Sequence, residues 1–147
     1  PSNLDLKTQI NDKIKNRDFW MPFAATVLKT KKYFYFQKNP SIENLKYMTN
    51  CLRTKAKGAD LLKAAVHPAD FTCRAQLLDK KDNKSYYDLI NAYGKKTGNF
   101  ALLNTSLNFH GFPLANDIYD AYKIVDKSNL DGLILENFLV VKKGIKI

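Results

Sequence analysis

The pattern of hydrophobic and polar positions alternates along the chain between a strand period and a helix period. Continuous or strictly alternating apolar stretches predict strands over residues 22–29, 71–78 and 99–105. Apolar positions at helical spacing predict helices over residues 4–14, 41–53, 84–93 and 117–126. The stretch GLILENFLVVKK (132–143) predicts one bent strand or two short ones. Because strands and helices alternate, we expect an α/β or α+β fold in a single domain, residues 1–147.

Capping residues indicate where three of these helices begin or end. Ser41 and Asn116 are the expected N-caps of their helices. Gly94 is expected to end the helix that begins at Lys84. The aromatic stretch KKYFYFQK (31–38) favours either a strand or an exposed docking surface.

Composition and charge narrow the classes of function. With 45% hydrophobic and 26% charged residues, the chain has the composition of a globular protein. Its formal net charge of +10 indicates attraction to polyanions, which leaves nucleic acid, phosphorylated small molecules and acidic protein surfaces open as partners. No apolar stretch approaches the roughly 20 residues that span a membrane, so we expect no membrane partner.

The cysteines and histidines point to no metal chemistry. Cys51 and Cys73 are too few for a disulfide framework and do not have the spacing of metal ligands. His67 and His110 are too few for an ordinary zinc site. We therefore expect no metal site formed by this chain, and reduced thiols in a cytoplasmic protein.

The stretch FALLNTSLNFHGFP (100–113) runs a buried strand into a row of small polar side chains. If the backbone stays extended, Asn104, Ser106 and Asn108 share one face of the strand and Thr105 lies on the other. Such a row can hold phosphate or ribose oxygens. The same side chains can also cap nearby backbone turns, and the pattern alone leaves both interpretations open.

Two further groups of polar residues suit anion binding. Thr72, Arg74 and Gln76 alternate along a predicted strand, where arginine suits a phosphate or carboxylate, although a surface ion pair would explain it equally. Lys15 and Arg17 are two residues apart and point the same way if the backbone is extended. Their mutual repulsion would be offset by a bound polyphosphate, or avoided if both are simply solvated.

Taken in order, these groups resemble the C-terminal part of the O-carbamoyltransferases. INDKIKNRDFWMPFAATVL (10–28) resembles the family block Asn-x-x-Ile-Lys-x-Arg-Glu followed by Pro-Phe-Ala-Pro-Ser-Val. AVHPADFTCRAQ (65–76) resembles the block ending in Asp-Gly-Thr-x-Arg-x-Gln. YYDLINAYGKKTGNFALLNTSLNFHGFPLANDIYDAY (86–122) resembles the block that contains Leu-Leu-Asn-Thr-Ser-Phe-Asn-x-x-Gly-Glu-Pro-Ile. The ending LDGLILENFLV (130–140) also fits, so the resemblance spans nearly the whole chain.

The resemblance implies a YrdC-like fold, a twisted mixed sheet flanked by helices, and a nucleotide-dependent reaction. It implies binding of ATP, accompanied by Mg²⁺, and of carbamoyl phosphate, with formation of carbamoyl-adenylate and release of pyrophosphate. The family signature, Lys-x-Arg followed distantly by Ser-x-Asn, falls on Lys15, Arg17, Ser106 and Asn108. In the family that the chain resembles, the acceptor hydroxyl is carbamoylated in a separate N-terminal domain of actin/kinase-like fold with its own metal site, so we expect this chain to be a piece of a longer protein.

The resemblance also implies a role for each candidate residue. Lys15 and Arg17 would hold phosphates, and Arg74 would contact carbamoyl phosphate or the triphosphate. The expected nucleotide- or substrate-binding residues are the polar side chains of the two strand segments, namely Thr72, Gln76, Asn104, Thr105, Ser106 and Asn108.

The chain departs from the family pattern at four positions, where Phe112 replaces Glu, Met21 replaces Arg, Ala25 replaces Pro and Phe71 replaces Gly. Because the signature residues are all present, we expect a working site. Two alternatives remain open. One is an RNA-binding or tRNA-modification-related YrdC-type module, which the net charge of +10 favours. The other is a catalytically inert interaction domain that has kept the fold.

Overall fold

The computed structural model describes residues 1–16, 18, 23–38 and 45–145. Contacts divide the chain into two compact units. The first, which we call the sheet unit, comprises Pro1–Leu4 and Pro22–Thr105. The second, the hairpin unit, comprises Asp5–Met21 and Ser106–Ile147. Both are mixtures of helix and strand, which confirms the predicted α/β class.

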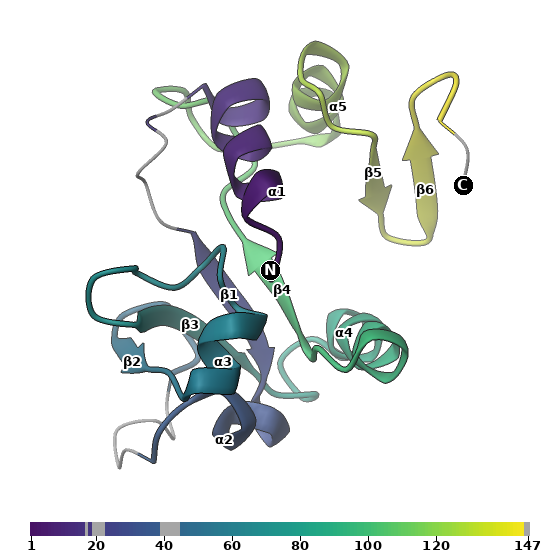
Figure 1. The fold of residues 1–147 in the computed structure, drawn as a ribbon. Coiled ribbons are helices and arrows are strands. Elements are labelled where there is room, and N and C mark those ends of the chain that lie inside the picture. Colours follow the sequence, from purple (N-terminus) through teal and green to yellow (C-terminus); the bar gives the residue numbers. More distant parts are fainter. Residues whose placement is uncertain (17, 19–22, 39–44, 146–147) are drawn as a thin grey trace. The chain divides into compact units, whose positions relative to one another are not determined.

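The sheet unit is built on four strands in the order β2-β3-β1-β4 (Figure 1). The strands are β1 (Ala24–Leu28), β2 (Cys51–Arg53), β3 (Thr72–Leu78) and β4 (Ala101–Asn104). Strand β1 runs parallel to β3 and antiparallel to β4, and β2 runs antiparallel to β3. The strands predicted from the apolar runs at 22–29, 71–78 and 99–105 are therefore confirmed, each a little shorter than expected.

One face of this sheet is the main core. Alternate residues of the three longer strands, among them Ala25, Val27 and Ala75, are completely buried. Helices α2 (Lys32–Tyr35) and α3 (Ala56–Leu61) contact each other beside the sheet and contribute to the same core (Figure 1). Tyr35 and Phe36 are also completely buried. The interpretation of KKYFYFQK as a strand is therefore wrong, because Lys32–Tyr35 is helical. Tyr33 and Phe34 are exposed, and a docking surface formed by them stays a prediction.

The opposite face of the sheet is apolar at one end of its strands and polar at the other. At one end, Leu28 and Leu78 pack against Ile90 of helix α4 (Lys84–Thr97), with Leu102 of β4 alongside. Towards the other end the same face carries Thr26, Gln76 and Asn104. The helix thus covers the apolar end, and the polar end begins where the helix contacts stop.

Helix α4 confirms the predicted start but not the predicted end. Asn83 caps it by accepting a hydrogen bond from the Tyr86 N–H, and Gly98, with φ of 75°, ends it. The expected end at Gly94 is wrong. Gly94 lies inside the helix, and close packing explains the glycine there, because a Cβ would collide with the ring of Phe100.

The helix predicted over 41–53 is also wrong for its described part. Residues 41–44, with the expected cap Ser41, lie outside the described residues. Residues 45–50 form bends, and Cys51–Arg53 is strand β2, paired with β3. The partner strand lies about twenty residues further along the sequence, so the local pattern carries no sign of the pairing.

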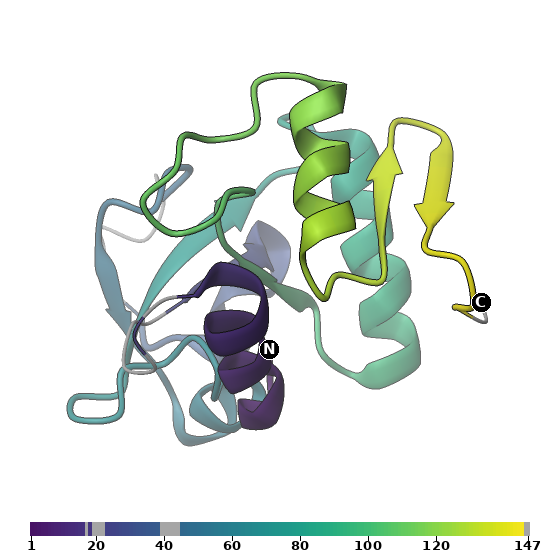
Figure 2. The ribbon, with the colours of Figure 1, turned by 90° about the horizontal axis from the view of Figure 1, so that it is seen from above.

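The hairpin unit combines helices with a two-stranded sheet. Helix α1 (Leu4–Gln9) continues into the π-helical segment η1 (Ile10–Lys15), which confirms the helix expected before residue 15. Helix α5 (Ile118–Lys127) lies beside the hairpin of β5 (Gly132–Leu135) and β6 (Phe138–Val141) (Figure 2). The two short strands confirm one of the alternatives predicted for 132–143. The cap of α5 is Asp117, which accepts from the Asp120 N–H, and not Asn116 as expected.

Within the described ranges, no helix combines the length and the hydropathy needed to cross a membrane.

Candidate functional site

The polar end of the sheet face holds three hydrogen-bonded side chains, Thr26, Gln76 and Asn104, which we call the amide trio. The Thr26 hydroxyl lies 2.9 Å from Gln76 Oε1, to which it donates. Asn104 Nδ2 donates to the same Gln76 oxygen at 3.0 Å and to the Thr26 hydroxyl at 2.9 Å. Thr26 is 0% exposed, whereas Gln76 and Asn104 are only partly buried. The buried Thr26 hydroxyl therefore fixes the two amide side chains, and these amides are the part of the trio that reaches the surface.

Arg74 lies on the same face of β3, two residues before Gln76. Its side chain is exposed, and no ion pair to it exists within the part of the chain that the structure describes. Thr72, one step further along this face, bonds to Asp70 through its N–H at 2.9 Å and its hydroxyl at 2.8 Å. These two hydrogen bonds lower the pKa of Asp70. Thr72 is thus fixed to the preceding turn, and the exposed cations on this face include Arg74 and also Arg53 of β2, the register partner of Thr72.

The hairpin unit contains a second polar group, the lysine cluster of Lys15, Ser106 and Asn108. The Lys15 ammonium donates to the Ser106 carbonyl at 2.5 Å, to the Ser106 hydroxyl at 3.0 Å and to Asn108 Oδ1 at 2.7 Å. The Ser106 hydroxyl also donates to Asn108 Oδ1, at 2.5 Å. Lys15 is 4% exposed. Residues more than ninety positions apart in sequence therefore meet around one buried ammonium group.

The backbone around Lys15 explains how it reaches this position. The helix widens into a π-helical turn over Ile10–Lys15, and Asn16 ends it in the left-handed region with φ of 49°. The Lys15 carbonyl accepts from the His110 N–H at 2.9 Å, which ties the helix end to the loop that carries Ser106 and Asn108. Lys15 is therefore helical, and the extended backbone assumed for Lys15 and Arg17 is wrong for Lys15.

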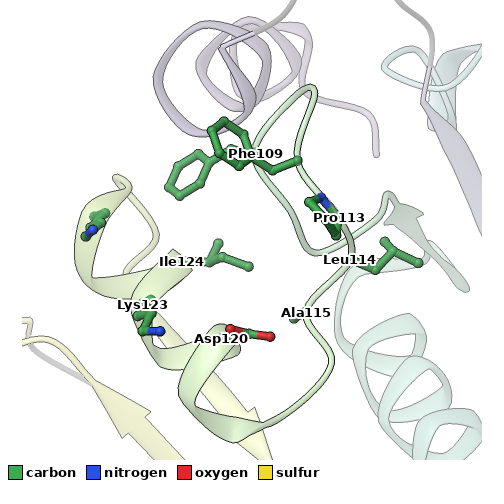
Figure 3. Close-up of a pocket in the computed structure, with 9 residues that line it drawn as sticks. Phe109, Pro113, Leu114, Ala115, Asp120, Lys123 and Ile124 are labelled. Carbon is green, nitrogen blue, oxygen red and sulfur yellow. The ribbon is translucent and has the colours of Figure 1, made fainter.

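A pocket of about 390 Å³ lies between this loop and α5 (Figure 3). Phe109, Pro113 and Ile124 give it an apolar lining, and Asp120 and Lys123 are at its wall (Figure 3).

Phe112, one of the departures from the family pattern, also lines the pocket and is 68% exposed. Asn108 Nδ2 donates to the Phe112 carbonyl at 2.7 Å. The change from Glu to Phe therefore alters the pocket wall. It does not remove the hydrogen bond from Asn108, because that bond is to the backbone of residue 112.

The structure thus brings the predicted residues together in two sets. Gln76, Asn104 and Arg74 share the sheet face, and Lys15, Ser106 and Asn108 form the lysine cluster. Arg17 and Met21 lie outside the described residues. The extended strand expected over 104–108 is wrong, since β4 ends at Asn104 and the chain bends at 107 and 108. Thr105, which stands between Asn104 and Ser106 in the sequence, is exposed.

Sequence reasoning missed Thr26, the residue on which the amide trio rests. Its signal is present in the chain: Thr26 is the one polar side chain inside the apolar run FAATVL (23–28). A lone hydroxyl in a buried strand needs a hydrogen-bond partner, and here the partners come from the two neighbouring strands.

Neither set contains a cysteine, a histidine or a carboxylate. Among the described residues, no group of three or more His, Cys, Asp or Glu is placed to hold a metal ion. Burial raises the pKa of the Cys73 thiol to about 12, so this cysteine stays protonated at neutral pH.

Residues 1–142 match the family model described as "Carbamoyltransferase C-terminus". The chain belongs to this family. The carbamoyltransferase C-terminus family is thereby shown over nearly the whole chain, which confirms the resemblance found in the motifs.

Individual proteins are similar to this chain over most of its length. The chain is 33% identical over 143 residues to the nodulation protein NolO of Bradyrhizobium diazoefficiens, covering 97% of this chain and 26% of the relative. It is 32% identical over 137 residues to the nodulation protein NolNO of Sinorhizobium fredii, covering 93% and 20%. An uncharacterized protein of Methanocaldococcus jannaschii is 32% identical over 143 residues, with coverage of 97% and 23%. The chain therefore spans about a quarter or less of the length of these relatives.

Proposed function

We propose that this carbamoyltransferase C-terminal domain binds ATP and carbamoyl phosphate and forms carbamoyl-adenylate, which carries the carbamoyl group to a hydroxyl acceptor in a separate N-terminal domain. The observation that carries the proposal is the lysine cluster. Lys15, Ser106 and Asn108, which match the family's Lys-x-Arg and Ser-x-Asn signature, form one hydrogen-bonded group. A signature whose distant halves meet around an ammonium group fits the binding of phosphate oxygens.

The proposed reaction balances with one water. Carbamoyl phosphate, ATP and water give carbamoyl-adenylate, pyrophosphate and inorganic phosphate. Water would first cleave the bond between the carbamoyl and phosphate groups of carbamoyl phosphate, which gives carbamate and inorganic phosphate. A carbamate oxygen would then bond to the α-phosphorus of ATP, and the bond from that phosphorus to the pyrophosphate leaving group would break. Catalysis of this kind rests on positioning and on neutralising charge, for which cations such as Lys15 and Arg74 are suited. Mg²⁺ would enter on the phosphate oxygens of ATP and on water, as it commonly does.

Titration of ATP and Mg²⁺ into the chain by calorimetry tests the proposal. Lys15→Met keeps the volume of the buried stem and removes the ammonium. A charge-assisted hydrogen bond contributes about 1.5–3 kcal/mol, so we expect the affinity for ATP to fall about tenfold to hundredfold. Ser106→Ala, which removes one acceptor of the ammonium, should weaken ATP binding less.

Lys13→Met is the matched control, since it removes a cation from the same π-helical segment at an exposed position. It should leave ATP affinity within about twofold, because an exposed charge is screened by water and salt. Thermal unfolding must show that each variant is folded. Equal ATP affinity in wild type and folded Lys15→Met would reject the role of the lysine cluster.

RNA binding is the second candidate, which the net charge of +10 favours. A protein that binds RNA through phosphates loses affinity steeply as salt rises. Titration with a single-stranded RNA at two salt concentrations separates the candidates. Steep salt dependence together with undetectable ATP binding would favour the RNA-binding module over the carbamoyl-adenylate reaction.

A further inference from the structure

The amide trio leaves one hydrogen-bond donor and one acceptor side by side on the sheet face. Gln76 Oε1 and Asn104 Nδ2 are engaged within the trio. Gln76 Nε2 and Asn104 Oδ1 have no partner among the described residues, and both side chains are partly exposed. The outward pair is therefore an N–H donor beside a carbonyl acceptor.

This pairing does not depend on which way the amides are turned. If both amides rotate together, Gln76 donates to Thr26, and Thr26 donates to Asn104. The trio then still closes, and the outward atoms become an acceptor on Gln76 and a donor on Asn104. The direct hydrogen bond from Asn104 to Gln76 couples the two amides, and the Thr26 hydroxyl, which bonds to both, holds the coupled pair in place. A donor and an acceptor face outward in either arrangement.

We propose that the amide trio recognises the carbamoyl group of carbamoyl phosphate, with Thr26 as the positioning residue that holds the two amides in place. A carbamoyl group presents one C=O acceptor and one NH₂ donor along the same edge, which complements the outward pair. This assignment rests on the proposed function and deepens it, because it separates recognition of the carbamoyl group from the phosphate contacts of the lysine cluster.

Arg74 favours carbamoyl phosphate over the other ligand with such an edge, the adenine base. Arg74 is two residues from Gln76 on the same strand face, a separation of about 7 Å between backbones that an arginine side chain can bridge. In carbamoyl phosphate the anionic group is attached directly to the carbamoyl carbon through oxygen. In ATP a ribose separates the base from the phosphates, so a phosphate ligand this close to the amides is not expected.

Two stable phosphonates test the assignment. Phosphonoacetamide carries the carbamoyl NH₂, and acetonylphosphonate carries a methyl group in its place with the same charge and similar shape. A net hydrogen bond is worth up to about a tenfold difference in affinity, so wild type should bind phosphonoacetamide about tenfold more tightly than acetonylphosphonate. Thr26→Val, which removes the hydroxyl at similar volume and leaves the amides held only by each other, should lower this ratio.

Three further variants make the readout specific. Thr26→Ser keeps the hydroxyl and should keep the ratio. Thr54→Val removes another buried hydroxyl of the same unit, one that donates to the Phe71 carbonyl, and should also keep the ratio. Arg74→Gln should weaken both phosphonates alike. A ratio reports recognition, so a variant that merely lowers stability does not change it.

The outcomes separate this inference from the proposed function. A wild-type ratio near one, with ATP still bound, would overturn the carbamoyl assignment and leave the proposed function standing. An unchanged ratio in Thr26→Val would overturn the role of Thr26. If Thr26→Val instead abolishes the preference for ATP over ITP, whose base has a carbonyl where adenine has an amino group, the trio reads adenine and the assignment is wrong. Absence of binding by ATP and both phosphonates would reject both proposals.

Discussion

The sheet unit contains two buried polar networks that use the same types of group in different ways. In one, the Tyr35 hydroxyl donates to Asn99 Oδ1 at 2.9 Å and accepts from the Phe100 N–H at 2.6 Å, while Asn99 Nδ2 donates to the Leu61 carbonyl. In the other, Thr26 holds Gln76 and Asn104. Both networks join segments that are distant in sequence around one hydroxyl that is completely buried.

The two networks differ in whether they are closed. The Tyr35–Asn99 network ends on backbone groups of α3 and of the segment before β4, and it faces the core. The amide trio ends on two amide groups that face outward. A closed network satisfies groups that burial would otherwise penalise, so its role is structural. An open network whose donors and acceptors are already fixed would bind a ligand at little further cost in ordering, as the carbamoyl proposal requires.

The largest difference that we expect between the core face and the polar face is in the rate at which their cysteine thiols are modified. Cys51 is exposed and pairs with Arg74 on the polar face, while Cys73, next in register, is buried on the core face. With a pKa of about 12, Cys73 has a thiolate fraction on the order of one in ten thousand at pH 8. A disulfide reagent should therefore modify Cys51 in the native protein and Cys73 at least about a thousandfold more slowly, limited by opening of the structure.

Mass spectrometry of the native protein, with Cys51→Ser as the control, checks this expectation. Fast modification of Cys73 in folded Cys51→Ser would contradict the closed core face. The raised pKa also sets a pH dependence. Because the unfolded thiol ionises near pH 8.5 and the folded thiol near 12, the stability linked to Cys73 is complete below about pH 8.5 and falls as pH rises towards 12.

Breaking the closed network should lower stability without changing ligand selectivity. Tyr35→Phe leaves the Asn99 Oδ1 acceptor and the Phe100 N–H donor unpaired in the core. Since each unsatisfied buried group costs about 1–3 kcal/mol and two are left unpaired, we expect the free energy of unfolding in urea to fall by about 2–6 kcal/mol. The preference for phosphonoacetamide should remain.

Tyr47→Phe provides the control, since Tyr47 is 67% exposed in the same unit and its loss of a hydroxyl should change stability by about 0.5 kcal/mol or less. If Tyr35→Phe cost no more than Tyr47→Phe, the Tyr35–Asn99 network would have no structural role. If it removed the phosphonoacetamide preference, the separation of the two networks would be wrong.

Elements that follow from local sequence pattern were predicted correctly, and elements that depend on tertiary contacts were not. Strands β1, β3 and β4 were predictable because burial imposes continuous or alternating apolar residues. Arg74 and Gln76 were found by alternation alone. Strand β2 and helix α2 were missed because pairing with β3 and burial of Tyr35 are tertiary effects that override local pattern. The end of α4 was missed for a similar reason, since packing against Phe100, a tertiary effect, requires the glycine at 94, and the helix ends at Gly98.

The candidate site was predictable as a set of residues but not as an arrangement. The motif resemblance selected Lys15, Ser106 and Asn108, yet nothing in the sequence shows that the ammonium bonds to both. The extended row from Asn104 to Asn108 was wrong because the chain bends after β4, and the hydrogen bonds of Asn104 then go to Thr26 and Gln76. Thr26 was overlooked because one threonine in an apolar run is also what an ordinary strand contains.

The smallest expected effect concerns the residues that precede the two networks. Gly98, with φ of 75°, comes directly before Asn99, and glycine adopts this conformation without strain. Phe71, with φ of 56°, comes directly before β3, which carries Gln76 of the open network. A left-handed conformation costs an L-residue about 1–2 kcal/mol, and glycine loses roughly 0.5–1 kcal/mol of that gain through the entropy of the unfolded chain. Phe71→Gly should therefore stabilise the protein by roughly 0.5–1 kcal/mol in urea unfolding.

Phe71→Ala separates strain from loss of the ring. Phe71 is 57% exposed, so removal of its side chain forfeits little buried area, and alanine retains the strain at positive φ. Alanine should therefore be no more stable than wild type, and glycine should exceed alanine by about 1 kcal/mol. Equal stability of the two variants would show that the turn before β3 is not strained. The open and closed networks would then differ only in their outward amides and not in how the chain enters them.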